Sequence, residues 1–212
     1  IATTHEPCLY SGKFDGVDIL FLRQVNDFAI ACPDEDLAKK VIDEINKHMS
    51  VQIKYLGLLT RFNGVDVEHT QDYIKIYNAT YILKILHGHR LWLESKHCHT
   101  FPIPMKAEAT FAKTIEQAQP PTTEKEKIRL QKEMKLHYQQ AIGELIYAMV
   151  TCRPDISYPL IKLSQYSVNP AREHYEAVKD IFYYLQCTAH KGIHFWQLFP
   201  NDDLPPHLIS FD

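Results

Sequence analysis

Two short apolar runs near the N-terminus, separated by a polar turn, constrain the fold of this chain most strongly. The runs are residues 19–22 (Ile-Leu-Phe-Leu) and 28–32 (Phe-Ala-Ile-Ala-Cys). Each has the length of a strand and is apolar on both faces, which is typical of strands covered on both sides. The turn between them contains Asn26 and Asp27, residue types that accept the tight backbone of a hairpin. The pattern predicts an antiparallel hairpin over residues 19–32, with Asn26 and Asp27 at its tip.

After this hairpin, the sequence pattern predicts a helix and a second hairpin, and then mainly helices. Residues 34–49 form an amphipathic pattern with acids in the first turn, which predicts a helix. Residues 62–77 alternate around a polar centre and predict a second hairpin. Further along, periodic apolar positions predict helices over residues 79–86, the charged run 124–135 and the stretch 141–185. The fold class is therefore α+β.

Prolines and capping residues divide the helical part of the chain. Pro102 and Pro104 favour extended backbone, so residues 87–119 are expected to be irregular. Asp155 is expected to cap one of the later helices. The pair Asn169-Pro170 has the residue types of an N-cap and a first helical position, and is expected to open the last helix.

Composition limits the classes of protein to consider. The chain has 212 residues, 45% of them hydrophobic, which is enough for a real core. The formal net charge of −3 gives no overall positive field, so any contact with nucleic acid must be local. We expect no membrane partner, because no apolar run reaches membrane-spanning length. The five scattered cysteines contain no CxxC, and the first residues do not resemble a signal peptide. We therefore expect a location in the cytoplasm or in an intracellular particle, not secretion. Because the chain begins at Ile1, we also expect it to be a piece of a longer reading frame.

The polar turn is the sharpest candidate site. Carboxylates at a hairpin tip are exposed and rigid, and oxygen ligands suit Mg²⁺. A polymerase uses such carboxylates to hold the metal ions that activate a primer hydroxyl and bind a triphosphate. From the residues alone, however, a polar hairpin tip without metal is the favoured interpretation.

The order of short motifs along the chain resembles the copia-type retrotransposon reverse transcriptases. In that family a strand, a Val-Asp-Asp turn and an apolar strand follow one another, as they do here over residues 19–32. Further motifs in the same order cover nearly the whole chain: Pro7-Cys8-Leu9-Tyr10, Leu56-Gly57, residues 62–67, 141–147 and 151–158, Leu163-Ser164-Gln165, Asn169-Pro170, residues 173–179 and Tyr184-Leu185.

The resemblance implies an organisation and a parent activity. Residues 1–78 would be the C-terminal part of a reverse-transcriptase palm, with antiparallel hairpins plus a helix. Residues 79–190 would be a helical thumb and connection, and 191–212 a linker and the first strand of a truncated ribonuclease H domain. The parent polyprotein would perform RNA-directed DNA synthesis on an RNA template and a DNA primer, with Mg²⁺ as cofactor.

The chain departs from the family at the turn itself. Asn26 stands where the family has its first Asp, so only Asp27 remains as a charged metal ligand, which weakens metal binding. An earlier Asp of the family's palm cannot be identified in residues 1–18, where Asp15 and Asp18 are better explained by the start of a strand. The fingers would also precede this chain. Whether the chain is an enzyme is therefore uncertain, and we expect it to be inactive alone. The alternative is a non-enzymatic, degenerate remnant that at most binds nucleic acid or protein.

Further site residues follow from the resemblance with weaker support. Phe62 and Gly64 would belong to a primer grip, although an ordinary hairpin explains them equally well without the resemblance. Cations of the run 124–135 could contact nucleic-acid phosphates: Lys125, Lys127, Arg129 and Lys132. The glutamates interleaved with them favour a solvated helix face.

Three further sequence features have roles that depend on the residues around them: Arg153, Asp212 and residues 96–99. Arg153 is expected to pair locally or to meet a phosphate. Asp212, after the apolar residues 208–211, would be the first carboxylate of the ribonuclease H domain, and it cannot form that site alone. Residues 96–99 (Lys-His-Cys-His) have the residue types of a zinc site, but no second pair of ligands follows. A loop is therefore favoured there.

Overall fold

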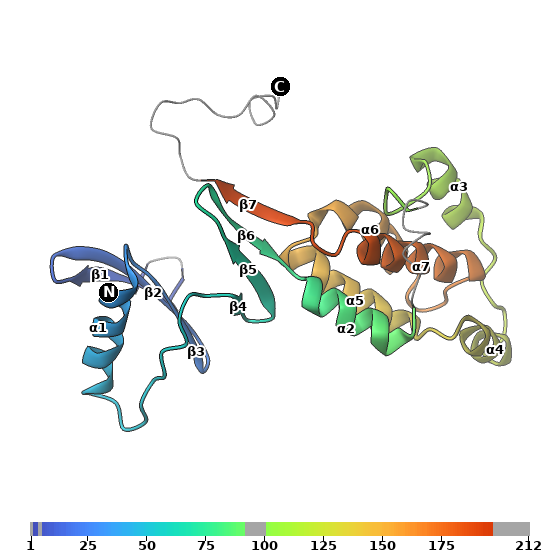
Figure 1. Ribbon diagram of the computed structural model, residues 1–212. Helices are drawn as coiled ribbons and strands as arrows, with labels where there is room; N and C mark the ends of the chain where they lie inside the picture. The colour runs from blue at the N-terminus through green and yellow to red at the C-terminus, as the bar shows by residue number, and fades with distance from the viewer. Residues whose placement is uncertain (1, 4–5, 92–100, 197–212) are drawn as a thin grey trace. The chain divides into compact units, whose positions relative to one another are not determined.

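This computed structural model describes residues 2–3, 6–91 and 101–196, with mainly antiparallel strands up to residue 77 and mainly helices after it (Figure 1). The contacts divide the chain into two compact units, residues 1–63 and 64–212. Each unit is described by itself below. The assignment of residues 1–78 to a palm and of residues 79–190 to a thumb stays a prediction.

The first unit contains a three-stranded antiparallel sheet. Its strands are β1 (Leu9–Phe14), β2 (Val17–Gln24) and β3 (Asp27–Ala31), with β2 in the centre. Asp15 and Gly16 form the tight turn between β1 and β2, with φ angles of 50° and 81°. The pairing of β2 with β3 confirms the predicted hairpin over residues 19–32.

Helix α1 (Glu35–Asn46) follows the sheet and lies beside it (Figure 1). The Asp34 carboxylate caps the helix by accepting a hydrogen bond from the Leu37 N–H at 2.8 Å. The helix ends earlier than predicted, because the Asn46 side-chain amide turns to the chain that follows. Its Oδ1 accepts from the Ile53 N–H at 2.6 Å, and its Nδ2 donates to the Ile53 carbonyl at 3.0 Å. The short strand β4 (Arg61–Phe62) ends the unit.

The sheet of the first unit is less covered than its sequence predicts. In β1, β2 and β3 no residue is fully buried, and Leu20 is 44% exposed. The expectation of strands covered on both sides is therefore wrong for this unit. The buried residues belong to the helix instead: Leu37, Ala38, Val41 and Ile42.

The second unit begins with the hairpin of β5 (Val65–His69) and β6 (Tyr73–Tyr77). This pairing confirms the second predicted hairpin, although Phe62 lies outside it, before the turn at Asn63-Gly64. Strand β7 (Gly192–Trp196), from the far end of the chain, pairs antiparallel with β6. A Cβ atom at Gly192 would lie 2.2 Å from the Ile76 carbonyl oxygen, so only glycine allows this close approach.

Helices form the rest of the second unit. They are α2 (Ala79–His89), α3 (Glu108–Gln117), α4 (Glu124–Met134), α5 (Tyr138–Thr151), the 3₁₀ helix η2 (Pro154–Ile156), α6 (Ser157–Ser164) and α7 (Arg172–Cys187). The predicted helices over 79–86, 124–135 and 141–185 are confirmed. The expectation of irregular chain over 87–119 is confirmed for residues 101–107, which contain the prolines, and wrong where α2 continues to His89 and α3 forms. Phe111 and Ile115, one turn apart, hold α3 against the core.

Neither Asn169 nor Asp155 caps a helix as predicted, because both side chains form hydrogen bonds with other residues instead. The Asn169 amide donates to the Pro121 carbonyl at 3.0 Å, and the last helix begins two residues later, with Ala171 as its N-cap. There His174 Nδ1 accepts from the Ala171 N–H at 2.9 Å, so its Nε2 donates to the Ile115 carbonyl at 3.0 Å. Burial lowers the pKa of His174, which keeps the neutral ring in this role. Asp155 lies inside η2 and caps no helix.

A hydrogen-bonded network around Arg153 joins η2 to the end of α7. The Arg153 side chain is 1% exposed and forms a two-pronged contact with the Asp155 carboxylate, at 3.0 and 2.8 Å. It also donates to the carbonyl and hydroxyl oxygens of Thr188, at 3.0 and 2.7 Å. The Tyr184 hydroxyl donates to Asp155 at 2.6 Å. Burial opposes ionisation of Asp155, but the bonds from Arg153 and Tyr184 outweigh it and lower its pKa.

A second buried junction joins the β5–β6 hairpin to the helices. The Asp66 carboxylate on β5 accepts from the backbone N–H and the hydroxyl of Thr80, each at 2.9 Å, and so caps α2. Asn78, fully buried between β6 and α2, donates to the Thr151 hydroxyl of α5 at 3.0 Å. The orientation of the hairpin therefore depends on side chains from both helices.

We predict that Arg153→Met lowers the free energy of unfolding by about 3 kcal/mol, because it removes the ion-pair partner of Asp155 and two hydrogen bonds to Thr188. The matched control is Arg172→Met. It removes a surface ion pair with Glu133, whose side chains are 46% and 51% exposed, and should cost below about 1 kcal/mol. Denaturant unfolding measures both variants, and equal losses would contradict a structural role for the buried network.

Candidate functional site

The turn between β2 and β3 is tighter than expected. Gln24 pairs with Asp27, so the turn consists of Val25 and Asn26, and Asp27 is the first residue of β3. The tip is thus shifted by one residue from the predicted Asn26 and Asp27. Both side chains are exposed, and they follow one another where a strand leaves a tight turn.

The backbone of this turn is strained at Val25. Its φ angle is 54°, in the left-handed region that β-branched residues rarely adopt. The side chain is 81% exposed, so burial does not compensate for this conformation. The strain is a local property of the turn and affects how firmly Asn26 and Asp27 are held.

The carboxylates near the turn do not gather into a metal site. Asp15 and Asp18 lie at the other end of β2, roughly 20 Å away at about 3.3 Å per residue. Asp18 is paired there with Lys13 at 3.4 Å, which fits the predicted role at the start of the strand. Within the described ranges, no three His, Cys, Asp or Glu side chains are grouped so that they could hold a metal ion. One carboxylate beside a neutral amide does not fit a pair of Mg²⁺ ions.

The residues assigned by resemblance to a primer grip flank a second tight turn. Phe62 ends β4 and is half-buried. Asn63 and Gly64 follow with φ angles of 49° and 81°. A Cβ at Gly64 would lie 2.9 Å from the Tyr147 hydroxyl of α5. The positive φ angle favours glycine whichever role the hairpin has, whereas the Tyr147 hydroxyl lies at the end of its side chain and could move aside.

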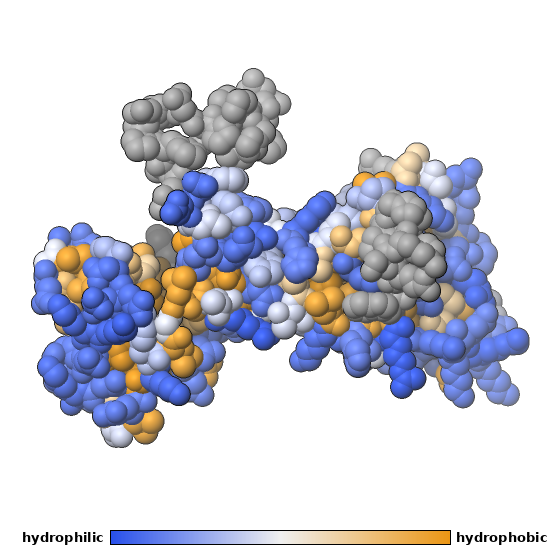
Figure 2. Space-filling view, viewed as in Figure 1, coloured by the Kyte–Doolittle hydropathy of each residue, from blue (hydrophilic) through white to orange (hydrophobic). Residues whose placement is uncertain are grey.

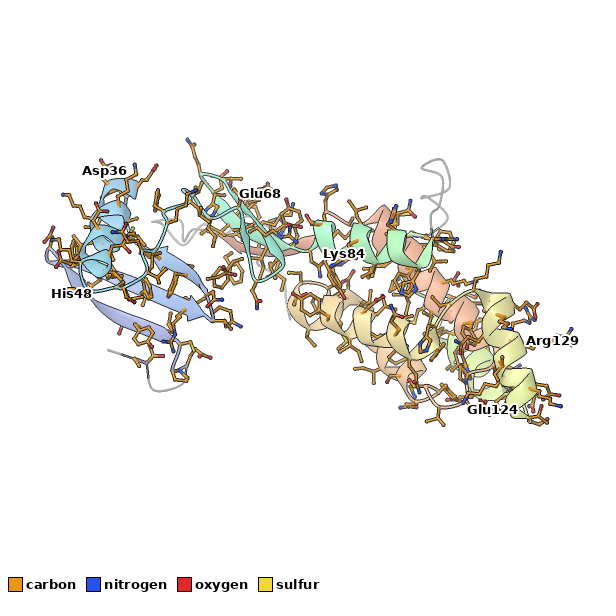
Figure 3. The ribbon with its side chains drawn as sticks, turned by 90° about the horizontal axis from the view of Figure 1, so that it is seen from below. Asp36, His48, Glu68, Lys84, Glu124 and Arg129 are labelled. Carbon is orange, nitrogen blue, oxygen red and sulfur yellow. The ribbon has the colours of Figure 1, made fainter. Side chains whose placement is uncertain are left out.

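Helix α4 presents a basic face to solvent. Lys125, Arg129 and Lys132 follow at intervals of four and three residues and therefore share one face. All three are exposed, whereas Lys127, on another face, is half-buried. The surface around α4 is predominantly hydrophilic in Figure 2, and Arg129 projects outward from the helix in Figure 3.

The glutamates interleaved along α4 are mostly engaged elsewhere. Glu126 accepts from the N–H groups of Thr122 and Thr123 and closes the capping box. Glu133 pairs with Arg172 at 2.6 Å. No ion pair within the described part of the chain involves Lys125, Arg129 or Lys132. The basic face therefore remains available to an anionic partner.

Of the remaining site residues predicted from the sequence, the structure describes Arg153. Arg153 pairs locally, and its burial leaves no surface for a phosphate. The motif at 96–99, Asp212 and the strand predicted before Asp212 lie outside the described residues. Among the helices of the described ranges, none is long and apolar enough to cross a bilayer.

Sequence reasoning missed an aromatic group on the second sheet. Tyr73 of β6 and Trp196 of β7 are cross-strand partners, with ring centroids 5.0 Å apart. His194 lies on the same face, 4.9 Å from Tyr73 and 5.9 Å from Trp196. The alternation in residues 192–196 predicts a strand, but it does not reveal that the strand pairs with residues more than a hundred positions earlier.

Transposon polyproteins are among the known proteins that are similar to this chain. The chain is 30% identical to the retrovirus-related Pol polyprotein from transposon TNT 1-94 of Nicotiana tabacum, over 89% of its own length and 14% of that polyprotein. It is 28% identical, over 82% of its length, to the Pol polyprotein from transposon RE1 of Arabidopsis thaliana, of which it covers 11%. A putative transposon Ty5-1 protein of Saccharomyces cerevisiae is 25% identical over 77% of the chain.

These comparisons establish the class of homologue. Homologues of the chain are retrovirus-related Pol polyproteins from transposons, which confirms the resemblance at that level. The chain spans only 11–14% of the length of the plant polyproteins. No protein-family model and no solved structure matches it.

We predict that Val25→Asn stabilises the β2–β3 hairpin by about 1 kcal/mol, because Asn tolerates a positive φ better than a β-branched residue. Hydrogen exchange of the β2 and β3 amides should slow by about fivefold. Val51→Asn is the control, since Val51 is 76% exposed in the same unit and has no positive φ. Unchanged or faster exchange in Val25→Asn would contradict the strained turn.

Proposed function

We propose that this chain is part of the reverse-transcriptase region of a transposon Pol polyprotein. The observation that carries the proposal is the β2–β3 hairpin, whose tight turn bears Asn26 and Asp27 at the place of the family's metal-binding pair. The similarity to plant Pol polyproteins over 82–89% of the chain supports it. The partners of the parent polyprotein are then an RNA template and a DNA primer, inside a cell or an intracellular particle.

The donor set at the turn limits what this chain does by itself. In the parent enzyme, Mg²⁺ would stabilise the charge that develops as the primer hydroxyl attacks a triphosphate. Asp27 supplies one carboxylate toward that task, and Asn26 supplies a neutral oxygen that binds a hard cation weakly. The role left to the chain is to place Asp27 at the start of β3, directly after the turn. We therefore propose that the 212-residue chain does not polymerise alone.

We predict no primer extension by the purified chain on a homopolymer RNA template with Mg²⁺ or Mn²⁺. In the parent polyprotein, Asn26→Asp should raise extension, because it restores a second charged ligand. Gln52→Glu is a control with the same change from a neutral amide to a carboxylate, at an exposed loop position of the first unit, and it should leave extension unchanged. Robust extension by the 212-residue chain would refute the inactivity, and no gain from Asn26→Asp would refute the role of the turn.

A second candidate function is a non-enzymatic binding module, favoured by the basic face of α4. Three exposed cations on one face can contact phosphates of a nucleic-acid backbone without any metal chemistry. The overall charge of −3 opposes such binding at long range. Contact would therefore be short-ranged and sensitive to salt.

If α4 contacts the backbone, the triple variant Lys125→Gln/Arg129→Gln/Lys132→Gln weakens binding to an RNA–DNA duplex. The slope of log affinity against log salt concentration should fall by up to about 3, one unit for each lost phosphate contact. Lys84→Gln/Lys113→Gln/Lys162→Gln makes the same charge change elsewhere in the unit. Equal effects of the two triple variants would show a general charge effect and would rule out α4 as the contact.

A further inference from the structure

One face of the second sheet carries aromatic rings arranged for stacking. Register places Tyr73 opposite Trp196 and Lys75 opposite His194, so all four side chains point to the same side of β6 and β7. The rings of His194 and Trp196 are nearly parallel, with 20° between their planes and 5.9 Å between centroids. His194 is exposed, while Tyr73 and Trp196 are half-buried.

Neighbouring contacts hold this group in place. The Tyr73 hydroxyl donates to the Glu68 carboxylate at 3.0 Å, and Lys75 Nζ lies 3.0 Å from the same carboxylate. The Tyr73 ring packs edge-on against both His194 and Trp196. Figure 3 shows Glu68 on this sheet. The rings are therefore ordered without a ligand, which reduces the entropy lost when a flat molecule binds.

Cross-strand packing accounts for part of the group. The Tyr73–Trp196 pair stabilises the ladder of β6 and β7 as aromatic pairs do in many sheets. This explanation does not require His194, which is exposed and lies two residues before Trp196 on the same strand. A third flat ring placed on the outer face of His194 would continue the stack that Trp196 and His194 begin.

We propose that His194, with Trp196 and Tyr73 behind it, is a stacking site for an unpaired nucleobase of a single-stranded nucleic acid. The inference rests on the proposed function, which supplies the class of ligand. Every nucleobase has a flat face that stacks on aromatic side chains, and bases within a duplex are already covered by their neighbours. The site therefore selects unpaired bases and tolerates any sequence.

The charges around the site separate it from the basic face of α4. Lys75 is paired with Glu68, so the platform has little net charge with which to attract phosphates. Stacking on this platform neutralises no phosphate and should depend weakly on salt, whereas binding through three cations depends on it strongly. The two surfaces can therefore be distinguished in one titration series.

The test uses the full 212-residue chain and a dye-labelled oligo(dA) of twelve nucleotides. In a Trp92→Phe background, Trp196 is the only tryptophan, and its fluorescence should be quenched on binding. His194→Thr should weaken binding by about tenfold, in the range measured for loss of one base–aromatic stack. Phe195→Thr is the matched control, because Phe195 is 56% exposed on the same strand but on the opposite face, and its binding should stay within about twofold.

A rescue variant separates stacking from folding and from hydrogen bonding. His194→Phe keeps a flat ring and loses both ring nitrogens, so it should bind as the parent does, and thermal unfolding should be alike for all variants. Unchanged affinity of His194→Thr, an equal loss in Phe195→Thr, failure of His194→Phe to bind, or no binding of the oligonucleotide would each overturn the stacking site. If the triple variant of α4 still weakens binding to the RNA–DNA duplex in any of these cases, only the stacking site is refuted. The proposed contact of α4 with nucleic acid then stands.

Discussion

The two-pronged contact between Arg153 and Asp155 is the interaction on which the second unit depends. The Arg153 side chain is 1% exposed, so water does not solvate its charge. Another group inside the protein must balance that charge. Asp155 balances it from η2, and Thr188 at the end of α7 accepts the remaining hydrogen bonds. Because β7 begins only four residues after Thr188, the same network determines where this last strand starts.

The candidate functional residues lie at a turn in the first sheet and along an edge strand in the second sheet. In the first unit, Asn26 and Asp27 lie at a strained turn on a sheet that is only half-buried. One carboxylate is present there, where two would be needed for a pair of metal ions. In the second unit, hydrogen bonds of Asp66 and Asn78 connect the β5–β6 hairpin to helices α2 and α5. The aromatic group lies at the edge of its sheet, where β7 pairs with β6.

Nucleic-acid contact in this chain would rest on two different forces. The cations of α4 act through charge, which has a longer range and is screened by salt. The rings of Tyr73, His194 and Trp196 act through stacking, which has a short range and neutralises no phosphate. A chain with a net charge of −3 needs such local features, because its overall field repels a polyanion.

Periodicity along the sequence was sufficient to predict both hairpins, helix α1 and the helices that follow residue 124, because these elements depend on neighbouring residues. It also predicted which residues lie at the β2–β3 turn, to within one position. Tertiary structure alone decided that Asn169 binds Pro121 and that Tyr184 joins the local pair of Arg153 and Asp155. It also decided that β7 pairs with β6 and brings His194 and Trp196 beside Tyr73. Local patterns encode which faces of an element are apolar, but a contact between distant residues depends on how the whole unit packs.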